Sequence, residues 1–131
     1  MLVSLAELRP NNWFINRAKL RRIREAWKNG RQYALPPVLV SKIDGRLALI
    51  DGHSRAYAAY ENGVKRIEAD VVRLEDIEGS SDLYRYIHRH GPDRGVLTIA
   101  DLSVRIVSPE EHRALWIDWC TEWLESHDSV D

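Results

Sequence analysis

The alternation of apolar and polar positions predicts a β-hairpin near the middle of the chain. Apolar runs over residues 38–43 and 47–50 are separated by the pair Asp44-Gly45. An Asp-Gly pair between two apolar runs is typical of a type I′ turn, in which both central residues have positive φ. By the same period-two criterion, two further strands are predicted, over residues 2–5 and 67–71.

Helical spacing of apolar residues predicts a first helix between Asn16 and Gly30. Leu20, Ile23 and Trp27 recur at intervals of three and four and would share one buried face. Asn16 is suited to capping the N-terminus of this helix, and Gly30 suits the position after its last turn.

A second helix is predicted over residues 53–62, directly after the hairpin. Its buried face should hold Ala56, Ala59 and Tyr60, and Gly63 should follow its last turn. The order of elements, with hairpin, helix and then strand, predicts an α+β fold with a small mixed β-sheet and flanking helices.

The chain after residue 74 has a different character. Residues 75–131 are expected to form an acidic, mainly helical extension that packs on a core made by residues 1–74. Ser81 is the expected N-cap of a short helix, and Ser108 and Glu111 have the spacing of a capping box at the start of a longer one. An apolar stripe follows along this last helix: Leu115, Trp116, Trp119, Cys120, Trp123 and Leu124.

The tryptophans of this stripe are most simply interpreted as core residues that pack the last helix onto the domain. A homodimer interface is the alternative, because aromatic side chains are enriched in interfaces. Within the stripe, Cys120 would behave as a small hydrophobe.

Bulk composition narrows the class of protein. With 44% apolar and 30% charged residues, the 131-residue chain has the composition of one globular domain. The single cysteine allows no internal disulfide, which predicts a cytoplasmic location. No apolar run approaches the ~20 residues needed to cross a bilayer, so no membrane partner is expected.

The net charge of −1 conceals a strong asymmetry. Residues 1–66 contain 13 Lys or Arg and 5 Asp or Glu, whereas residues 67–131 contain 6 and 15. A basic first half predicts an anionic partner, such as a nucleotide or a nucleic acid. The alternative is that the two halves complement each other, within the monomer or in a homodimer.

The basic residues are concentrated in the first predicted helix. Seven Lys or Arg lie between Arg17 and Arg31, against one acid, Glu25. A solvated helical face is the preferred interpretation. The alternative is a nucleic-acid- or protein-binding surface, in which the contacts would come from Arg21, Arg22 and Arg24. A third interpretation is that one or two of the seven basic residues reach the phosphates of a nucleotide.

The sequence "IDGHSR" marks the point where the second hairpin strand becomes a helix. The N–H groups at a helix N-terminus lack intrahelical partners and attract anions. His53, Ser54 and Arg55 can donate hydrogen bonds to a phosphate, and Gly52 allows close approach to the backbone. Asp51 can bind a metal ion that bridges phosphates, or accept a proton from a substrate hydroxyl.

A purely structural interpretation of this turn is also open. Ser54 would then cap the helix, His53 would pack in the interior, and Arg55 would be a solvated surface charge. The remaining histidines add no clear site: His88 and His90 are two residues apart and point in different directions on a helix, and His112 is expected to face solvent.

The segment "LPPVLVSKIDGRLALIDGHSRAYAAYENGVKRIEADVV" resembles the core of the ParB/sulfiredoxin superfamily. Upstream, "LVSLAELRPNNWFINRAKLRRIREAW" resembles the family's first strand, proline-containing loop and first helix, so the likeness covers residues 2–73. It implies that ATP, ADP or CTP binds with Mg²⁺. The implied phosphate ligands are Gly52, His53, Ser54 and Arg55.

Departures from the family pattern separate its branches. Gly52 occupies the position of the sulfiredoxin catalytic cysteine, which argues against sulfinic-acid reduction. The 58 residues that follow the core are acidic and do not resemble the helix-turn-helix and dimerisation domains of partition proteins, which argues against that kind of DNA binding.

The motif is closest to the ParB-like free serine kinases, whose turn reads Asp-Gly-His-His-Arg. The resemblance implies phosphate transfer to a small hydroxyl metabolite. These kinases use a glutamate two residues after the loop proline as base, and here Asn12 holds that position. An amide cannot accept the proton, so the catalytic candidates are Asn12, as the altered position, and Asp51, as the substitute base. The alternative is a nucleotide-sensing switch, in which binding alone is the function.

Overall fold

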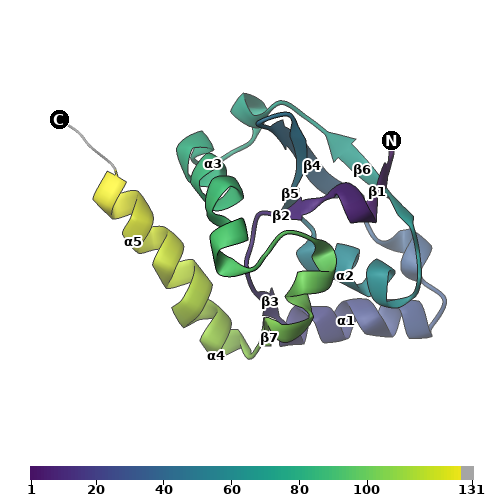
Figure 1. Ribbon diagram of the computed structural model, residues 1–131. Helices are drawn as coiled ribbons and strands as arrows, with labels where there is room; N and C mark the ends of the chain where they lie inside the picture. The colour runs from purple at the N-terminus through teal and green to yellow at the C-terminus, as the bar shows by residue number, and fades with distance from the viewer. Residues whose placement is uncertain (128–131) are drawn as a thin grey trace.

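The computed structural model describes residues 1–127 (Figure 1). The strands are β1 (Leu2–Ser4), β2 (Arg9–Pro10), β3 (Ile15–Asn16), β4 (Val38–Ile43), β5 (Arg46–Asp51), β6 (Arg66–Val71) and β7 (Ile106–Val107). The α-helices are α1 (Arg17–Lys28), α2 (His53–Glu61), α3 (Ser81–His90), α4 (Pro109–His112) and α5 (Asp118–His127). A π-helical turn, η6 (Arg113–Ile117), joins α4 to α5, and five 3₁₀ turns complete the list: η1 (Leu5–Glu7), η2 (Gln32–Ala34), η3 (Leu74–Asp76), η4 (Pro92–Arg94) and η5 (Ile99–Val104).

Five strands form a mixed sheet in the order β1-β6-β4-β5-β2. The outer pair β1–β6 and the central hairpin β4–β5 are antiparallel, whereas β4–β6 and β2–β5 are parallel. A separate parallel pair joins β3 to β7. The predicted α+β fold with a small mixed sheet is therefore confirmed.

The predicted hairpin is present between β4 and β5. Asp44 has φ 52° and Gly45 has φ 79°, as a type I′ turn requires. The carboxylate of Asp44 accepts hydrogen bonds from Arg89 at 2.9 and 3.0 Å, so the tip of the hairpin is tied to the end of α3.

The main core lies between the sheet and the helices α1 and α2. Val40 and Leu49 face each other across β4 and β5 and are fully buried, as is Leu20 of α1. Asn16 caps α1 as predicted, because its side chain accepts from the backbone N–H groups two and three residues later.

Helix α2 buries a different tyrosine from the one predicted. Ala56 and Ala59 are buried as expected, but Tyr60 is 44% exposed and Tyr57 is 6% exposed. The buried face is broader than a single stripe and includes Ala58 as well. Tyr60 therefore lies at its rim, where its ring packs on that of Tyr57 at 5.9 Å between centroids.

Helix α3 covers a smaller apolar cluster on the other face of the sheet. Ile43, Ala48 and Leu74 form the buried part of this cluster, with Tyr84 of α3 packed against it. The helix is capped one residue earlier than predicted. Ser80 is the N-cap, because its hydroxyl accepts from the N–H three residues on, whereas Ser81 is already helical.

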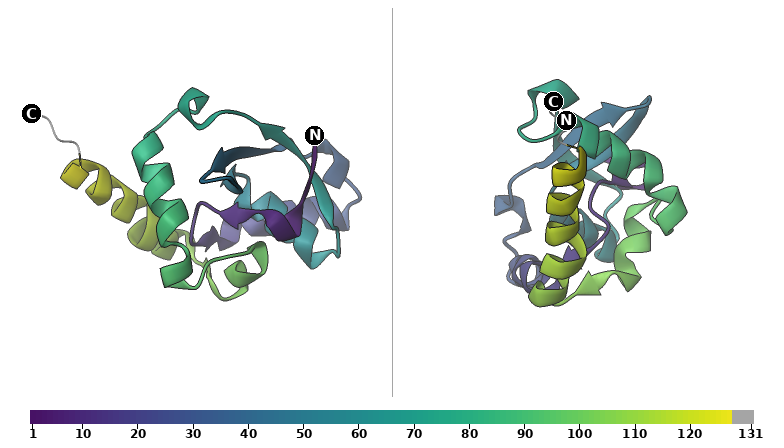
Figure 2. Two further views of the ribbon diagram at one scale, coloured as in Figure 1. Left: turned by 45° about the horizontal axis from the view of Figure 1, so that its top comes forward. Right: turned by 90° about the vertical axis from the view of Figure 1, so that its left-hand side faces the viewer.

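The C-terminal segment forms one long helical element from Pro109 to His127 (Figure 2). The predicted capping box is present: Ser108 and Glu111 exchange hydrogen bonds at 3.1 and 3.0 Å. Trp116 joins the main core, where its ring lies 5.4 Å from that of Trp13.

Two members of the predicted apolar stripe face outward. Leu115 is 47% exposed and Leu124 is 40% exposed, while Trp116 is buried. Trp116, Trp119, Cys120 and Trp123 all pack on the core, so the buried stripe is narrower than predicted and Leu115 and Leu124 lie on its two borders. No helix within residues 1–127 is long and apolar enough to span a membrane.

Trp13 is the side chain that fastens the C-terminal helix to the core. It is 1% exposed and contacts Trp116 and Trp119, and the guanidinium of Arg94 lies 4.6 Å from its ring centre. We expect Trp13→Ala to lower the free energy of unfolding by about 3–5 kcal/mol, measured by urea denaturation. As a control, Val104→Ala, at an 88% exposed position, should change it by less than about 0.5 kcal/mol. Equal effects of the two variants would contradict this role.

Candidate functional site

The turn between β5 and α2 leaves a helix N-terminus uncapped. Gly52 adopts φ 100° and ψ 30°, and no side chain caps α2. The first bond within the helix joins the N–H of Ala56 to the carbonyl of Gly52 at 2.9 Å. The backbone N–H groups of His53, Ser54 and Arg55 consequently have no partner inside the helix. Ser54 is the second residue of α2, so the interpretation of Ser54 as its cap is wrong.

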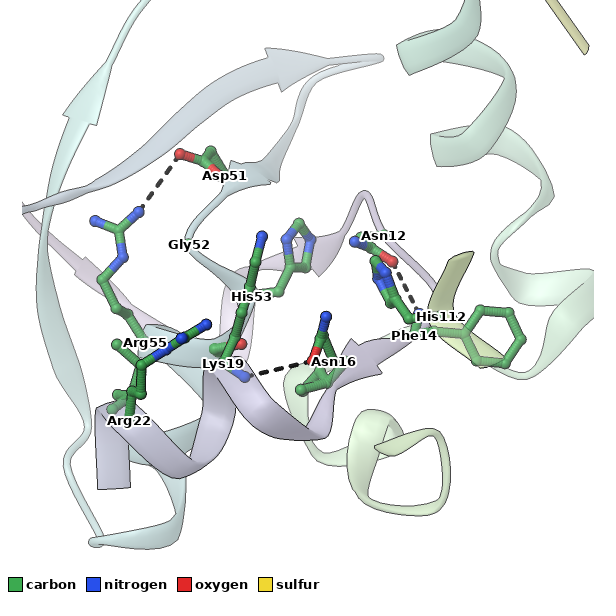
Figure 3. Close-up of a pocket in the computed structure, with 13 residues that line it drawn as sticks. Asn12, Phe14, Asn16, Lys19, Arg22, Asp51, Gly52, His53, Arg55 and His112 are labelled. Atoms are coloured by element: carbon green, nitrogen blue, oxygen red, sulfur yellow. Dashed lines mark hydrogen bonds and ion pairs between the residues drawn. The ribbon is translucent and has the colours of Figure 1, made fainter. Parts of the chain in front are cut away.

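These N–H groups lie at a cleft of about 250 Å³ between α1, α2 and the loop before β3 (Figure 3). All of the residues proposed from the turn and from the kinase comparison line it: Asn12, Asp51, Gly52, His53, Ser54 and Arg55. The structure thus brings Asn12 to the turn, although about forty residues separate them in sequence.

Gly52 is required by the packing of the turn itself. A Cβ atom at this position would lie 2.7 Å from Cγ1 of Val38 and 3.1 Å from Cζ of Arg55. Its φ also falls in the left-handed region that L side chains rarely adopt. The glycine is therefore explained by the fold, and close approach of a ligand is an additional consequence.

Arg55 is held by backbone carbonyls. Its Nη1 donates to the carbonyl oxygens of Pro36 and Pro37, both at 2.7 Å, and its Nη2 lies 3.4 Å from the carboxylate of Asp51. The side chain is only 18% exposed, so the interpretation of Arg55 as a solvated charge is wrong. The guanidinium still contributes a positive charge to the cleft, with part of its donor set already used.

His53 is packed in the interior. It is 8% exposed, and its Nε2 accepts a hydrogen bond from the backbone N–H of Asn11 at 2.9 Å. Burial lowers the pKa of His53 to about 4, against a partly compensating attraction from Asp51. The neutral ring therefore carries its proton on Nδ1, so Nε2 has no proton to donate, and the role of His53 as a phosphate ligand stays a prediction.

Asn12 and Asp51 differ in how firmly they are held. The Oδ1 atom of Asn12 accepts from the backbone N–H of Phe14 at 2.9 Å, which fixes the amide inside the loop. Asp51 is 75% exposed at its side chain and touches only Arg55 among its charged partners within residues 1–127. It is the one carboxylate that lines the cleft in that part of the chain.

The cleft also contains two residues of the basic helix, which the sequence did not identify individually for this site. Lys19 and Arg22 line it from α1. They are three residues apart and so lie on one face of the helix, and this spacing is the signal that could have identified them. The nucleic-acid triad is divided: Arg22 lines the cleft, whereas Arg24 pairs with Glu61 at 2.5 and 2.9 Å.

His112 forms part of the cleft wall and is 8% exposed, so the expectation that it faces solvent is wrong. Helix α4 begins directly after β7, whose pairing with β3 draws the helix onto the loop around Phe14. Burial lowers the pKa of His112, with a further contribution from Lys19. Within residues 1–127, no group of three or more His, Cys, Asp or Glu side chains could hold a metal ion.

Comparisons with known proteins give a fold and no activity. The chain matches no protein-family model and no curated protein. Among solved structures it is similar to protein Atu1540 from Agrobacterium tumefaciens, with 18% sequence identity and a TM-score of 0.54; the match covers 88% of this chain and 64% of that one. It is also similar to sulfiredoxin from Arabidopsis thaliana, with 21% identity and a TM-score of 0.43, over 66% of this chain and 96% of that one.

The similarity to Atu1540 shows a shared fold, and at this identity the fold alone. The chain spans less than two thirds of that protein's length. The superfamily, its branch and the activity stay predictions.

Buried neutral histidines make stability depend on pH. His53 and His88 have pKa values of about 4 in the folded chain because of burial, against 6.5 when exposed. The unfolded chain therefore binds more protons between these values. The free energy of unfolding should fall as the pH is lowered from about 6.5 to 4, by up to about 1.4 kcal/mol per pH unit for each group.

We expect His53→Gln to reduce this slope, measured by urea denaturation across the window. The Oε1 atom of glutamine can replace Nε2 as acceptor for the N–H of Asn11. His90→Gln, at a half-exposed position on α3, serves as the control and should keep the wild-type slope. An unchanged slope in His53→Gln would contradict the assignment.

Proposed function

We propose that the cleft at the N-terminus of α2 binds the phosphate groups of a nucleotide: ATP, ADP or CTP. The proposal rests on one observation. Three backbone N–H groups without helical partners and three cationic side chains lie at the same cleft. Lys19, Arg22 and Arg55 line the cleft, against the single carboxylate of Asp51. Phosphates bind at such helix ends because both the N–H groups and the helix dipole favour negative charge.

Asp51 fits the role of a ligand to Mg²⁺. Magnesium retains several waters and needs one or two carboxylates beside the phosphates. Asp51 is exposed and directly precedes the uncapped turn, so its free oxygen can face an ion there. The bound ion would neutralise phosphate charge, and Arg55 would then be released from its pairing with Asp51.

Phosphate transfer to a small hydroxyl compound is the second candidate. Asp51 lines a second cleft of about 510 Å³ on the other side of the turn, together with Ile50 and Tyr84. For transfer, the hydroxyl would have to lie where the two clefts share Asp51, with its oxygen facing both the carboxylate and the terminal phosphate. Asn12 offers no base, so in this scheme Asp51 would have to accept the proton.

Nucleotide binding should raise the melting temperature. At a concentration about 100 times Kd, a ligand that binds only the folded state stabilises it by about 2.7 kcal/mol, which amounts to several degrees for a chain of this size. We expect a shift with at least one of ATP, ADP or CTP, and a larger shift with Mg²⁺ than with EDTA. Arg22→Ala should weaken Kd about tenfold or more, since a charged hydrogen bond contributes about 1.5–3 kcal/mol.

Arg21→Ala is the matched control. It removes the same side chain from the adjacent position of α1, and Arg21 does not line the cleft. Its Kd should stay near that of the wild type. No shift with any of the three nucleotides would overturn the proposal, and so would equal losses in the two variants. Turnover of bound nucleotide that requires a hydroxyl compound and is lost in Asp51→Asn would establish the second candidate.

A further inference from the structure

The C-terminal helix has an outward face that meets no other part of the chain within residues 1–127. Ile117, Thr121 and Leu124 recur at i, i+4 and i+7 and are all exposed, with Ile117 at 50% and Leu124 at 40%. A second stripe with the same spacing runs directly beside it: Asp118, Glu122 and Glu125. We call these two stripes the acidic helix face.

The acids of this face have no ion-pair partner among the residues that the structure describes. The pairs found within residues 1–127 involve other carboxylates, such as those of Glu61, Asp44 and Asp76. The opposite side of α5 is occupied, because Trp119 and Trp123 pack toward Trp13 and Tyr86. The acidic helix face is therefore an apolar stripe with unpaired charges along one border.

A groove with apolar walls and a mainly basic border lies at the C-terminal end of α1. It encloses about 610 Å³ and is walled by Trp27, Tyr33, Leu35, Pro36 and Pro37, among others. Tyr33 is 91% exposed, the highest value among the large apolar side chains. We call this the proline groove.

Basic residues predominate around the proline groove. Arg55 and Arg66 line it directly, beside Glu68, the one carboxylate of its lining within residues 1–127. Lys28 and Arg31 flank the groove as chain neighbours of Trp27 and Gln32. Lys28, Arg31 and Arg66 are exposed and are in no ion pair within residues 1–127. An amphipathic helix that lays its apolar side into a groove of opposite charge is a recurrent mode of recognition.

The helix cannot reach the groove of its own chain. In Figure 1, α5 projects at one side of the molecule along α3, whereas the end of α1 lies at the other side. Four of the ten large exposed apolar side chains lie on the two surfaces: Ile117 and Leu124 on the acidic helix face, and Leu2 and Tyr33 in the proline groove. Within residues 1–127 of a single copy, nothing covers either surface.

We propose that the acidic helix face of one copy docks into the proline groove of a second copy. If the exchange is reciprocal, it closes a two-fold dimer with two identical contacts. Basic residues from the first half of one subunit's sequence then contact acidic residues from the second half of the other's. Arg55 lines both this groove and the nucleotide cleft, but Lys28 and Arg31, on which the proposal is tested, lie outside that cleft.

The first test is the mass of the wild-type protein in solution, measured by sedimentation velocity across a concentration series. We expect a monomer–dimer equilibrium that weakens at least tenfold between about 0.05 and 0.5 M salt, because the paired charges are at the surface. A wild type that stays monomeric at millimolar concentration overturns the proposal. A dimer whose dissociation constant does not change with salt concentration also overturns the proposal.

The second test uses charge reversal. Variant one carries Glu122→Lys and Glu125→Lys, and variant two carries Lys28→Glu and Arg31→Glu. Each variant alone should lose dimerisation at least tenfold, because its helix and its groove have the same sign of charge. An equimolar mixture should recover it, because both contacts in the mixed dimer again join opposite charges.

The control reverses two exposed acids elsewhere, Asp70→Lys and Glu78→Lys, and should dimerise like the wild type. Failure of the mixture to associate overturns the proposal, as does dimerisation of either variant alone at wild-type strength. Melting temperatures near that of the wild type confirm that the variants are folded. Binding of an oligonucleotide by monomeric wild type, lost in Lys28→Glu with Arg31→Glu, would assign the basic rim to nucleic acid instead.

Discussion

The contact between Gly52 and Val38 is the constraint on which the rest of the site depends. A left-handed residue without a Cβ lets the chain turn sharply off β5 while it lies against β4. The turn sets the direction of α2, leaves its first N–H groups facing the cleft, and brings Arg55 under the carbonyls of Pro36 and Pro37. Gly52 therefore links the end of β5, the direction of α2 and the position of the cleft edge.

The same residues carry structural and chemical roles in this turn. Arg55 tightens the loop before β4 and also supplies charge to the cleft, and His53 fills the interior while its Nε2 satisfies the backbone of Asn11. Because these side chains already make hydrogen bonds within the fold, fewer of their donors remain for a ligand. The cationic groups of the cleft that remain unpaired are those of Lys19 and Arg22, which are exposed on α1 and in no ion pair within residues 1–127.

Short-range sequence patterns predicted much of this architecture. The Asp44-Gly45 turn, the Asn16 cap and the capping box at Ser108 each depend on a few neighbouring residues, and all are present. The errors arose where distant segments meet. His112 is buried because β7 pairs with β3, and Leu124 is exposed because only the tryptophan side of the last helix packs on the core. The position of Asn12 at the cleft was implied by resemblance, whereas Lys19 and Arg22 required knowledge of how α1 lies against α2.

The β3–β7 pair has a consequence for the order in which the protein forms. Ile15 is bonded in register to Ile106, so this contact closes a loop that contains most of the chain. Contacts between residues so far apart in sequence form late, because the entropy of loop closure must be overcome first. The uncapped turn is built from near neighbours and can exist early, but the wall that contains His112 arrives only with the last helix. The turn can therefore form before the wall that encloses the cleft is in place.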